Sequence, residues 1–294
     1  MRRHPTPFRS STHLLLLFAV SACGPQIDDA PPEASAATIT VVDATGTERH
    51  LRGPAQRIVS LVPSATSTLR ALGVESRLVG RTDFDTAPWV QVFPSVGGGL
   101  DPNLEEIVAL QPDLVIRFAG EQDPRTPARL DDLGITHFAL RPDRLEDAYT
   151  SITQLGALTG SEQAANAVVA EIRAELDALR SAVASRPRLR TVYLLGGTPP
   201  WVAGSGTYID DVLSLSGGDN VFSDLGSLYA SVSPEQIRAR EIDVVLVSSA
   251  GDFDPALAPG ARIVEVGGTL EIPGPGTAEA AWRLAELLHA AKLR

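Results

Sequence analysis

Histidine and cysteine, which often supply nucleophiles, general bases and metal ligands, are scarce in this sequence. There are five histidines and one cysteine, and the histidines after residue 22, His50, His137 and His289, are far apart and form no ligand motif. A zinc or manganese site needs several histidines and carboxylates that converge on one ion. The sequence also lacks the G-x-S-x-G, H-E-x-x-H and P-loop motifs. We therefore expect no enzyme activity and no directly bound metal ion.

The single cysteine, Cys23, follows a segment typical of an export signal. Arginines near the N-terminus precede an apolar run at residues 14–20, which is too short to span a bilayer as a helix. Small residues at 21–22 then precede Cys23, as in a bacterial lipobox. This predicts that residues 1–22 are a cleaved lipoprotein signal peptide and that Cys23 carries the lipid anchor. The alternative is an ordinary signal peptide with an incidental cysteine.

The remaining composition favours an acidic globular protein behind a flexible tether. Residues 23–37 are rich in proline, alanine and acidic residues, which predicts a tether. The whole chain has a formal net charge of −11, and loss of the basic signal peptide would make it more acidic. An acidic protein does not neutralise phosphates, so we expect no nucleic-acid partner. We expect a monomer.

Short β-branched runs alternate with amphipathic stretches from Arg57 onward, which is typical of βα units around a parallel sheet. In the first half, the pattern predicts strands at 57–61, 114–116 and 136–139. It also predicts a helix from Pro63 with Ser64 as its N-cap, and another helix at 128–133. In the second half, it predicts strands at 191–195, 244–247 and 263–266 and a helix at 278–293.

A helix-prone segment separates these two halves. Residues 145–184 favour helix almost throughout, with Gly160-Ser161 as the one clear interruption. The predicted plan is an N-terminal α/β lobe at 38–142, a linker helix at 143–186 and a C-terminal α/β lobe at 187–294.

An internal repeat supports two related lobes. Residues 103–116 align with residues 233–246, and both read as an N-cap, a helix, a short loop and a strand. The identical positions are Glu105/Glu235, Ile107/Ile237, Ala109/Ala239, Asp113/Asp243 and Val115/Val245. Asn103 and Ser233 are the predicted N-caps, with Glu106 and Gln236 expected to complete capping boxes.

The order and spacing of several motifs resemble the periplasmic cobalamin- and siderophore-binding proteins of ABC importers. The similarity runs from about Ile39 to the C-terminus. The motifs are 57–66 (RIVSLVPSAT), 79–80 (VG), 94–98 (PSVGG), 103–105 (NLE), 112–115 (PDLV), 199–201 (PPW), 217–222 (GGDNVF) and 233–236 (SPEQ). The resemblance implies an α/β fold of two Rossmann-like lobes joined by a long backbone α-helix, with a ligand cleft between the lobes.

The resemblance also implies a function and its partners. The protein would be a lipoprotein outside the cytoplasmic membrane, in the periplasm or another extracytoplasmic space. It would capture a metal-chelate ligand without a resident cofactor and deliver it to an ABC permease dimer. In relatives, one glutamate on each lobe engages permease arginines, and these positions map to Glu105 and Glu235. The alternative is that both carboxylates only stabilise the first turn of a helix.

The family pattern suggests aromatic contacts to the ligand from Phe84 and Trp201. The candidates that could add polar or stacking contacts are Arg81, Asp83, Trp89 and Tyr208. The alternative for each side chain is packing in the core or on the surface of a lobe.

The sequence leaves the ligand open among cobalamin, ferric siderophores and haem. Cobalamin-binding relatives carry a tryptophan in the segment that aligns with 97–100 and an Asp-Trp loop near 268–272, and this chain carries neither. Two other functions also stay open at this point, a lipid-anchored hydrolase and a ligand sensor or adaptor without a role in transport.

Overall fold

A computed structural model of the chain describes residues 38–120, 125–249, 251 and 253–294. The predicted signal peptide, Cys23 and the tether lie outside these residues and stay predictions. Among the described residues, no helix combines the length and the apolar character needed to cross a bilayer.

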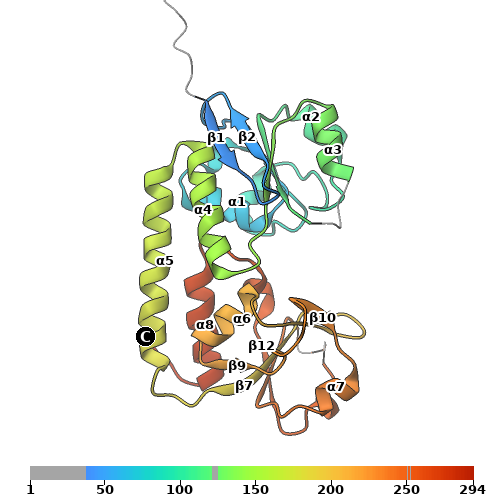
Figure 1. The fold of residues 1–294 in the computed structure, drawn as a ribbon, viewed down its shortest axis with the longest axis vertical. Coiled ribbons are helices and arrows are strands. Elements are labelled where there is room, and N and C mark those ends of the chain that lie inside the picture. The colour runs from blue at the N-terminus through green and yellow to red at the C-terminus, as the bar shows by residue number, and fades with distance from the viewer. Residues whose placement is uncertain (1–37, 121–124, 250, 252) are drawn as a thin grey trace, which may run out of the picture. The chain divides into compact units, whose positions relative to one another are not determined.

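The N-terminal lobe, in the upper half of Figure 1, is built on a parallel sheet with the order β4-β3-β5-β6. Its strands are β3 (Ile58–Ser60), β4 (Leu78–Gly80), β5 (Leu114–Phe118) and β6 (His137–Leu140). Its helical segments are α1 (Pro63–Ala71), η1 (Glu75–Arg77), η2 (Pro88–Val92), α2 (Leu104–Ala109) and α3 (Arg125–Asp132). A hairpin of β1 (Ile39–Val42) and β2 (Glu48–Leu51) precedes this sheet. The strands at the centre of the sheet are buried, as a parallel sheet covered on both faces requires.

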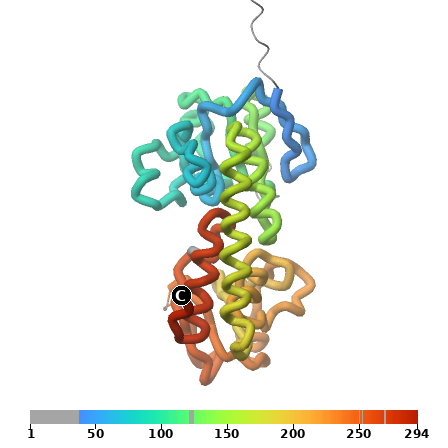
Figure 2. Tube along the Cα trace, turned by 90° about the vertical axis from the view of Figure 1, so that its left-hand side faces the viewer, coloured from blue at the N-terminus to red at the C-terminus, as the bar shows by residue number. Residues whose placement is uncertain are grey.

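The segment at 143–186 holds two helices rather than the one linker helix expected from the sequence. These are α4 (Leu145–Thr159) and α5 (Glu162–Val183), and they break where Gly160 adopts a left-handed φ of +66°. The two helices pack closely at small residues, because a Cβ added to Gly156 would lie 2.5 Å from that of Ala165. Figure 2 shows the longer helix, α5, running past both lobes.

The C-terminal lobe has a mixed sheet with the order β10-β8-β7-β11-β12, and β9 also pairs with β7. Its strands are β7 (Leu189–Leu194), β8 (Trp201–Ala203), β9 (Gly218–Asn220), β10 (Tyr229–Ser231), β11 (Val244–Val247) and β12 (Arg262–Glu265). Its helical segments are α6 (Tyr208–Leu215), α7 (Pro234–Arg238), η4 (Pro255–Leu257), η5 (Gly267–Glu271) and α8 (Thr277–His289). The chain returns from η5 to the linker helices through α8, which packs against α5. The fold class predicted from the sequence, two α/β lobes with a long helix between them, is confirmed.

The internal repeat has the same structural role in each lobe. The side chain of Asp113 accepts hydrogen bonds from the backbone N–H groups of Gln56 and Arg57, at 2.8 and 3.0 Å. Its counterpart Asp243 accepts one from the backbone N–H of Arg190 at 2.8 Å. Asp113 therefore fixes the chain just before β3, and Asp243 fixes it at the start of β7.

Two predicted helix caps are wrong. Ser64 is not the N-cap of α1, because the helix starts at Pro63 and its N-cap is Val62. Proline suits the first helical position since its φ is already helical and it has no N–H to satisfy. Asn103 caps α2 as predicted, but its own N–H donates to Val96 O at 2.8 Å, so Glu106 completes no capping box. The capping box of Ser233 and Gln236 is confirmed.

Candidate functional site

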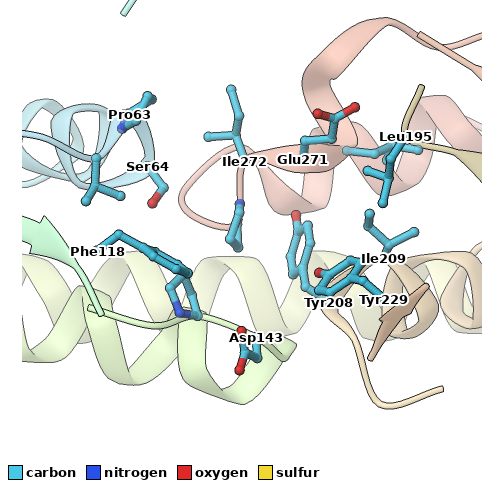
Figure 3. A pocket seen from close by; sticks show the side chains of 14 residues that line it. Pro63, Ser64, Phe118, Asp143, Leu195, Tyr208, Ile209, Tyr229, Glu271 and Ile272 are labelled. Atoms are coloured by element: carbon cyan, nitrogen blue, oxygen red, sulfur yellow. The ribbon is translucent and has the colours of Figure 1, made fainter. Parts of the chain in front are cut away.

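The main candidate site is a pocket of about 330 Å³ between the two lobes (Figure 3). The N-terminal lobe and the start of the linker supply Val62, Pro63, Ser64, Phe118, Pro142 and Asp143. The C-terminal lobe supplies Leu195, Tyr208, Ile209, Tyr229, Leu270, Glu271, Ile272 and Pro273. The lining is mainly aliphatic and aromatic, with a few polar groups, as is usual for small-molecule sites.

The pocket lies where the parallel strands of each lobe end. Phe118 is the last residue of β5, and Leu195 directly follows β7. Val62 follows β3 and leads into α1. Ligands of open α/β sheets bind beyond the carboxyl ends of the strands, where loops from neighbouring strands converge. Here two such edges face one another across the pocket.

Tyr208 joins the two sides at the bottom of the pocket. Its side chain is only 2% exposed, and its hydroxyl lies 2.9 Å from the Thr277 hydroxyl. Its backbone N–H donates to Asp143 O at 2.5 Å. Burial raises the pKa of Tyr208 to about 12, so the phenol stays protonated at neutral pH. The start of α6 is thus fixed against the segment that leads into α4.

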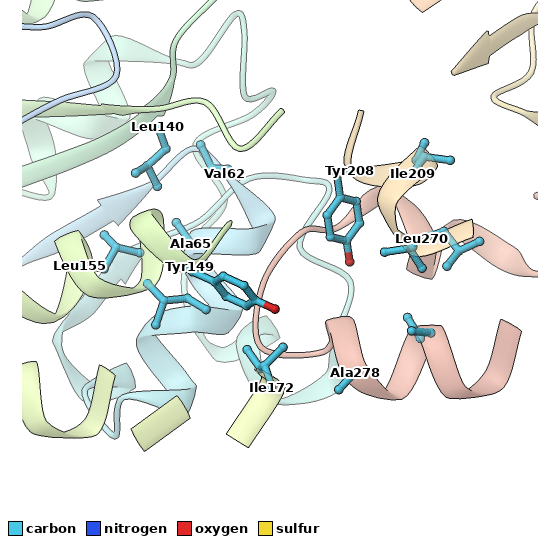
Figure 4. Close-up of a cluster of buried hydrophobic side chains, with 14 of the residues drawn as sticks. Val62, Ala65, Leu140, Tyr149, Leu155, Ile172, Tyr208, Ile209, Leu270 and Ala278 are labelled. Carbon is cyan, nitrogen blue, oxygen red and sulfur yellow. The ribbon is translucent and has the colours of Figure 1, made fainter. Parts of the chain in front are cut away.

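A continuous cluster of buried hydrophobic side chains lies beneath the pocket and includes residues of both lobes (Figure 4). Val62, Leu140 and Tyr149 come from the N-terminal lobe and α4, while Ile209 and Leu270 come from the C-terminal lobe. Such packing is dense and resists deformation. The lobes therefore have no separate cores at their junction.

The carboxylate of Glu271 also lines the pocket, on the side of the C-terminal lobe. The Tyr193 hydroxyl donates to Glu271 Oε1 at 2.5 Å, and the Ser248 hydroxyl donates to the same oxygen at 3.1 Å. Burial, followed by the hydrogen bond to Glu271, raises the pKa of Tyr193, so this phenol remains a donor. The carboxylate of Glu271 is thereby held in a fixed position.

Of the six residues predicted to contact the ligand, Tyr208 lines the pocket and the other five do not. Trp201 is 48% exposed, and its position in β8 puts it opposite Ser231 of β10. The pocket residue Tyr229 lies two positions along β10, on the same face of the sheet, and such diagonal neighbours are roughly 7–8 Å apart. Trp201 therefore lies on the same face of the sheet as Tyr229, outside the residues that line the pocket.

Phe84 lies at the tip of a tight turn in the N-terminal lobe and is 69% exposed. The turn is closed by Asp85, whose side chain accepts hydrogen bonds from the N–H and hydroxyl of Thr82 at 2.9 and 2.8 Å. This leaves the ring without a place in the hydrophobic core, so it is available for contact with another molecule.

The other three candidates make contacts within the N-terminal lobe. Arg81 donates to Thr82 O and to Gln91 Oε1, at 2.9 and 2.8 Å. The carboxylate of Asp83 accepts a hydrogen bond from the Ser95 hydroxyl at 2.6 Å. The ring of Trp89 packs against the core, with the guanidinium of Arg70 at 4.6 Å from the ring centre. Whether these side chains also touch a ligand stays a prediction.

Most of the pocket lining was not predicted from the sequence, including Phe118, Asp143, Tyr229 and Glu271. The available signal was position, because Phe118 lies just after the strand predicted at 114–116 and Asp143 follows the strand predicted at 136–139. Tyr229 and Glu271 had no such signal. β10 is antiparallel, and Glu271 lies in a short helical turn after the last strand.

Glu105 and Glu235 occupy equivalent places in the two lobes. Each is an exposed residue in the first turn of its helix, α2 or α7. Both helices lie on the side of the molecule away from α5, one in each lobe (Figure 1). The Arg238 guanidinium lies 3.6 Å from Glu235 Oε1. Hydrogen bonds from its own N–H and from Ser233 lower the pKa of Glu235, which keeps it ionised.

Within the described residues, no group of three or more His, Cys, Asp or Glu side chains is arranged to hold a metal ion. The histidines most removed from solvent have other roles. His137 accepts a hydrogen bond from Arg117 Nε at 3.1 Å, and its Nε2 lies 3.1 Å from Asp131 Oδ1. His289 packs beside Gly217.

Comparison with known proteins gives a consistent group of relatives. The vitamin B12-binding protein of Vibrio cholerae is 31% identical over 196 residues, which cover 66% of this chain and 71% of the relative. The vitamin B12-binding protein of Vibrio campbellii is 29% identical over 197 residues, covering 67% and 72%.

Solved structures share the fold. The crystal structure of the periplasmic vitamin B12-binding protein of Vibrio cholerae has a TM-score of 0.70 and 27% identity, and the match covers 82% of this chain and 99% of the other. A periplasmic heme-binding protein from Roseiflexus, in its apo form, also has a TM-score of 0.70 and 27% identity, with 81% and 99% covered.

The family assignment follows from a match that covers both lobes. The family model described as "Periplasmic binding protein" matches residues 58–258, which reach from β3 through the linker helices to the segment before β12. The chain therefore belongs to the periplasmic binding protein family, whose members bind solutes and are not enzymes.

Proposed function

We propose that this protein captures a metal-chelate ligand of the cobalamin, ferric-siderophore or haem class and delivers it to an ABC permease. The observation that carries the proposal is the pocket lined from both lobes by Phe118, Tyr208 and Tyr229 together with aliphatic side chains. Aromatic faces suit a flat or rigid chelate because they offer apolar contact at a small cost in conformational entropy. The names of the vitamin B12- and heme-binding relatives agree with this class.

The size of the pocket favours a ligand that extends beyond it. A whole macrocyclic chelate is larger than about 330 Å³, so part of it would remain outside the lining residues. The exposed rings of Trp201 and Phe84 could cover that outer part, one from each lobe. This arrangement would give both rings a ligand-binding role although neither lines the pocket itself.

Native mass spectrometry of the soluble Cys23→Ser form with cyanocobalamin, haemin and a set of ferric siderophores tests the proposal. We expect one class to form a 1:1 complex that Tyr229→Ala weakens. Val42→Ala, which alters an exposed side chain on the β1–β2 hairpin, is the matched control and should bind normally. Failure of every chelate to bind would refute the proposed ligand class.

Delivery would use Glu105 and Glu235 as contacts to the permease. Two exposed carboxylates at equivalent places suit a partner built from two related subunits that present arginines. Surface charge pairs of this kind mainly set orientation and the rate of encounter. Their positions on α2 and α7, outside the residues that line the pocket, allow docking and ligand binding to be tested separately.

The protein would act from outside the cytoplasmic membrane, tethered through a lipid on Cys23. Buried acyl chains provide such an anchor, and the acidic residues 23–37 would serve as the spacer between the membrane and the lobes. Names of the relatives that include the word periplasmic support this location.

A further inference from the structure

The charges around the pocket are unevenly compensated. Among the described residues that line it, the only carboxylic acids are Asp143 and Glu271, and none is lysine, arginine or histidine. Asp143 already has a cationic partner, since its Oδ2 lies 2.7 Å from Arg141 Nε. Of the two carboxylates in the described pocket lining, Glu271 is therefore the one without a cationic partner.

Glu271 receives only neutral donors. Both of its hydrogen bonds, from the hydroxyls of Tyr193 and Ser248, go to Oε1. Within the described part of the chain, Oε2 accepts no hydrogen bond, and no cationic side chain lies within ion-pair distance of either oxygen. The side chain is thus fixed through one oxygen while the other is free to accept from a ligand.

The pKa of Tyr229, which also lines the pocket, reflects the negative charges around it. Burial raises the pKa of Tyr229, and the negative charges of Asp143 and Glu271 raise it further. Tyr229 therefore remains protonated and can offer its hydroxyl to a ligand. An anionic group placed in this pocket would meet the same repulsion that disfavours the Tyr229 phenolate.

We infer that Glu271 selects the charge class of the ligand, so that the pocket takes neutral or cationic chelates with N–H or ammonium donors and disfavours anionic ones. The inference rests on the proposed function. Amide side chains or an ammonium group would donate to Glu271 Oε2, whereas carboxylate- or catecholate-bearing chelates would bring like charges together. Glu271 is exposed, and a ligand that covers it would remove part of its surrounding water, so a single charge pair there would change affinity by about tenfold.

The test compares four probes of different charge with wild-type protein and a Glu271→Gln variant, by titration calorimetry. The probes are ferrioxamine B, which is cationic, cyanocobalamin, which is neutral, and haemin and ferric enterobactin, which are anionic. Glutamine keeps an oxygen acceptor for Tyr193 and Ser248, removes the negative charge and places an NH2 donor at the position of Oε2. Glu162→Gln, at an exposed residue in the first turn of α5, is the control for the loss of one negative charge elsewhere.

We expect wild-type protein to bind the cationic or the neutral probe more tightly than either anion. Glu271→Gln should weaken any cationic complex by about tenfold and strengthen an anionic one by a similar factor, while Glu162→Gln changes neither. Tighter binding of an anionic probe by wild-type protein, or an equal effect of Glu271→Gln on all probes, would overturn the inference and leave the proposed function intact. Binding of none of the four would overturn both.

Discussion

Replacement of Trp201 by alanine should weaken ligand binding without unfolding the protein. The side chain is 48% exposed, and the whole tryptophan side chain offers roughly 250 Å², so about 120 Å² is available to a ligand. If the ligand covers between half and all of this area, the loss at about 25 cal/mol per Å² is roughly 1.5–3 kcal/mol. That corresponds to an affinity about 10 to 150 times lower.

The fold should tolerate this change because Trp201 is not part of the core. The register of β8 depends on backbone pairing with β10 and on Val202, which is buried on the opposite face of the strand from Trp201. We therefore expect an unchanged circular dichroism spectrum, with the affinity measured by titration calorimetry on the soluble Cys23→Ser form.

Leu133→Ala is the matched control for this experiment. Leu133 is 50% exposed and follows α3, and it does not line the pocket. Its replacement should leave affinity unchanged. If Trp201→Ala binds as tightly as the Leu133 control, the ring does not contact the ligand and the extension of the site along β8 is wrong.

Three further predictions address the anchor, the docking face and a buried histidine. Cys23→Ser should move the protein from the membrane to the soluble fraction, and unchanged, detergent-dependent fractionation would contradict lipidation. Glu105→Arg combined with Glu235→Arg should lower uptake by whole cells sharply and leave ligand affinity within error, although each single exposed pair contributes only about 0.2–1 kcal/mol; a parallel loss of affinity would make these residues part of the ligand site. Burial, with Arg49 and Arg117 nearby, lowers the pKa of His137, so the folded state favours the neutral ring. Its contribution to stability is therefore present above the unfolded pKa of about 6.5 and is lost as the pH falls below it. The melting temperature of wild-type protein should thus fall more steeply than that of His137→Gln from about pH 7 to about pH 5, and parallel curves would refute this.

The sequence predicted the lobes well because their signals are local. Strands such as β5 and β11 are short apolar runs, and the repeat at 103–116 and 233–246 gave the same helix and strand twice. Asp113 and Asp243 were aligned from sequence alone, and their shared hydrogen-bonding role explains why the same residue type occurs at both places.

The pocket was harder to predict because its residues meet only through tertiary packing. Tyr208 could be named from its sequence, but its contact with Asp143 depends on how α6 meets the segment before α4. The position of Glu271 depends on hydrogen bonds from the hydroxyls of Tyr193 and Ser248, which are 78 and 23 residues away in sequence. No periodicity or motif marks such a cluster. Similarly, serine is a common N-cap residue, but Pro63 takes the first helical position and makes Val62 the N-cap instead of Ser64.

Helix α8 contributes buried side chains, among them Ala281 and Leu284, to the same cluster that contains Val62 and Leu69 of the N-terminal lobe. In sequence it follows every strand of both sheets. Because α8 packs against α5 and α6, a chain that emerges N-terminus first would keep the apolar faces of these two helices uncovered until α8 had emerged. For the same reason, a fragment that ends before Thr277 would lack the helix that covers this apolar surface, and we expect it to aggregate and to be cleaved by proteases.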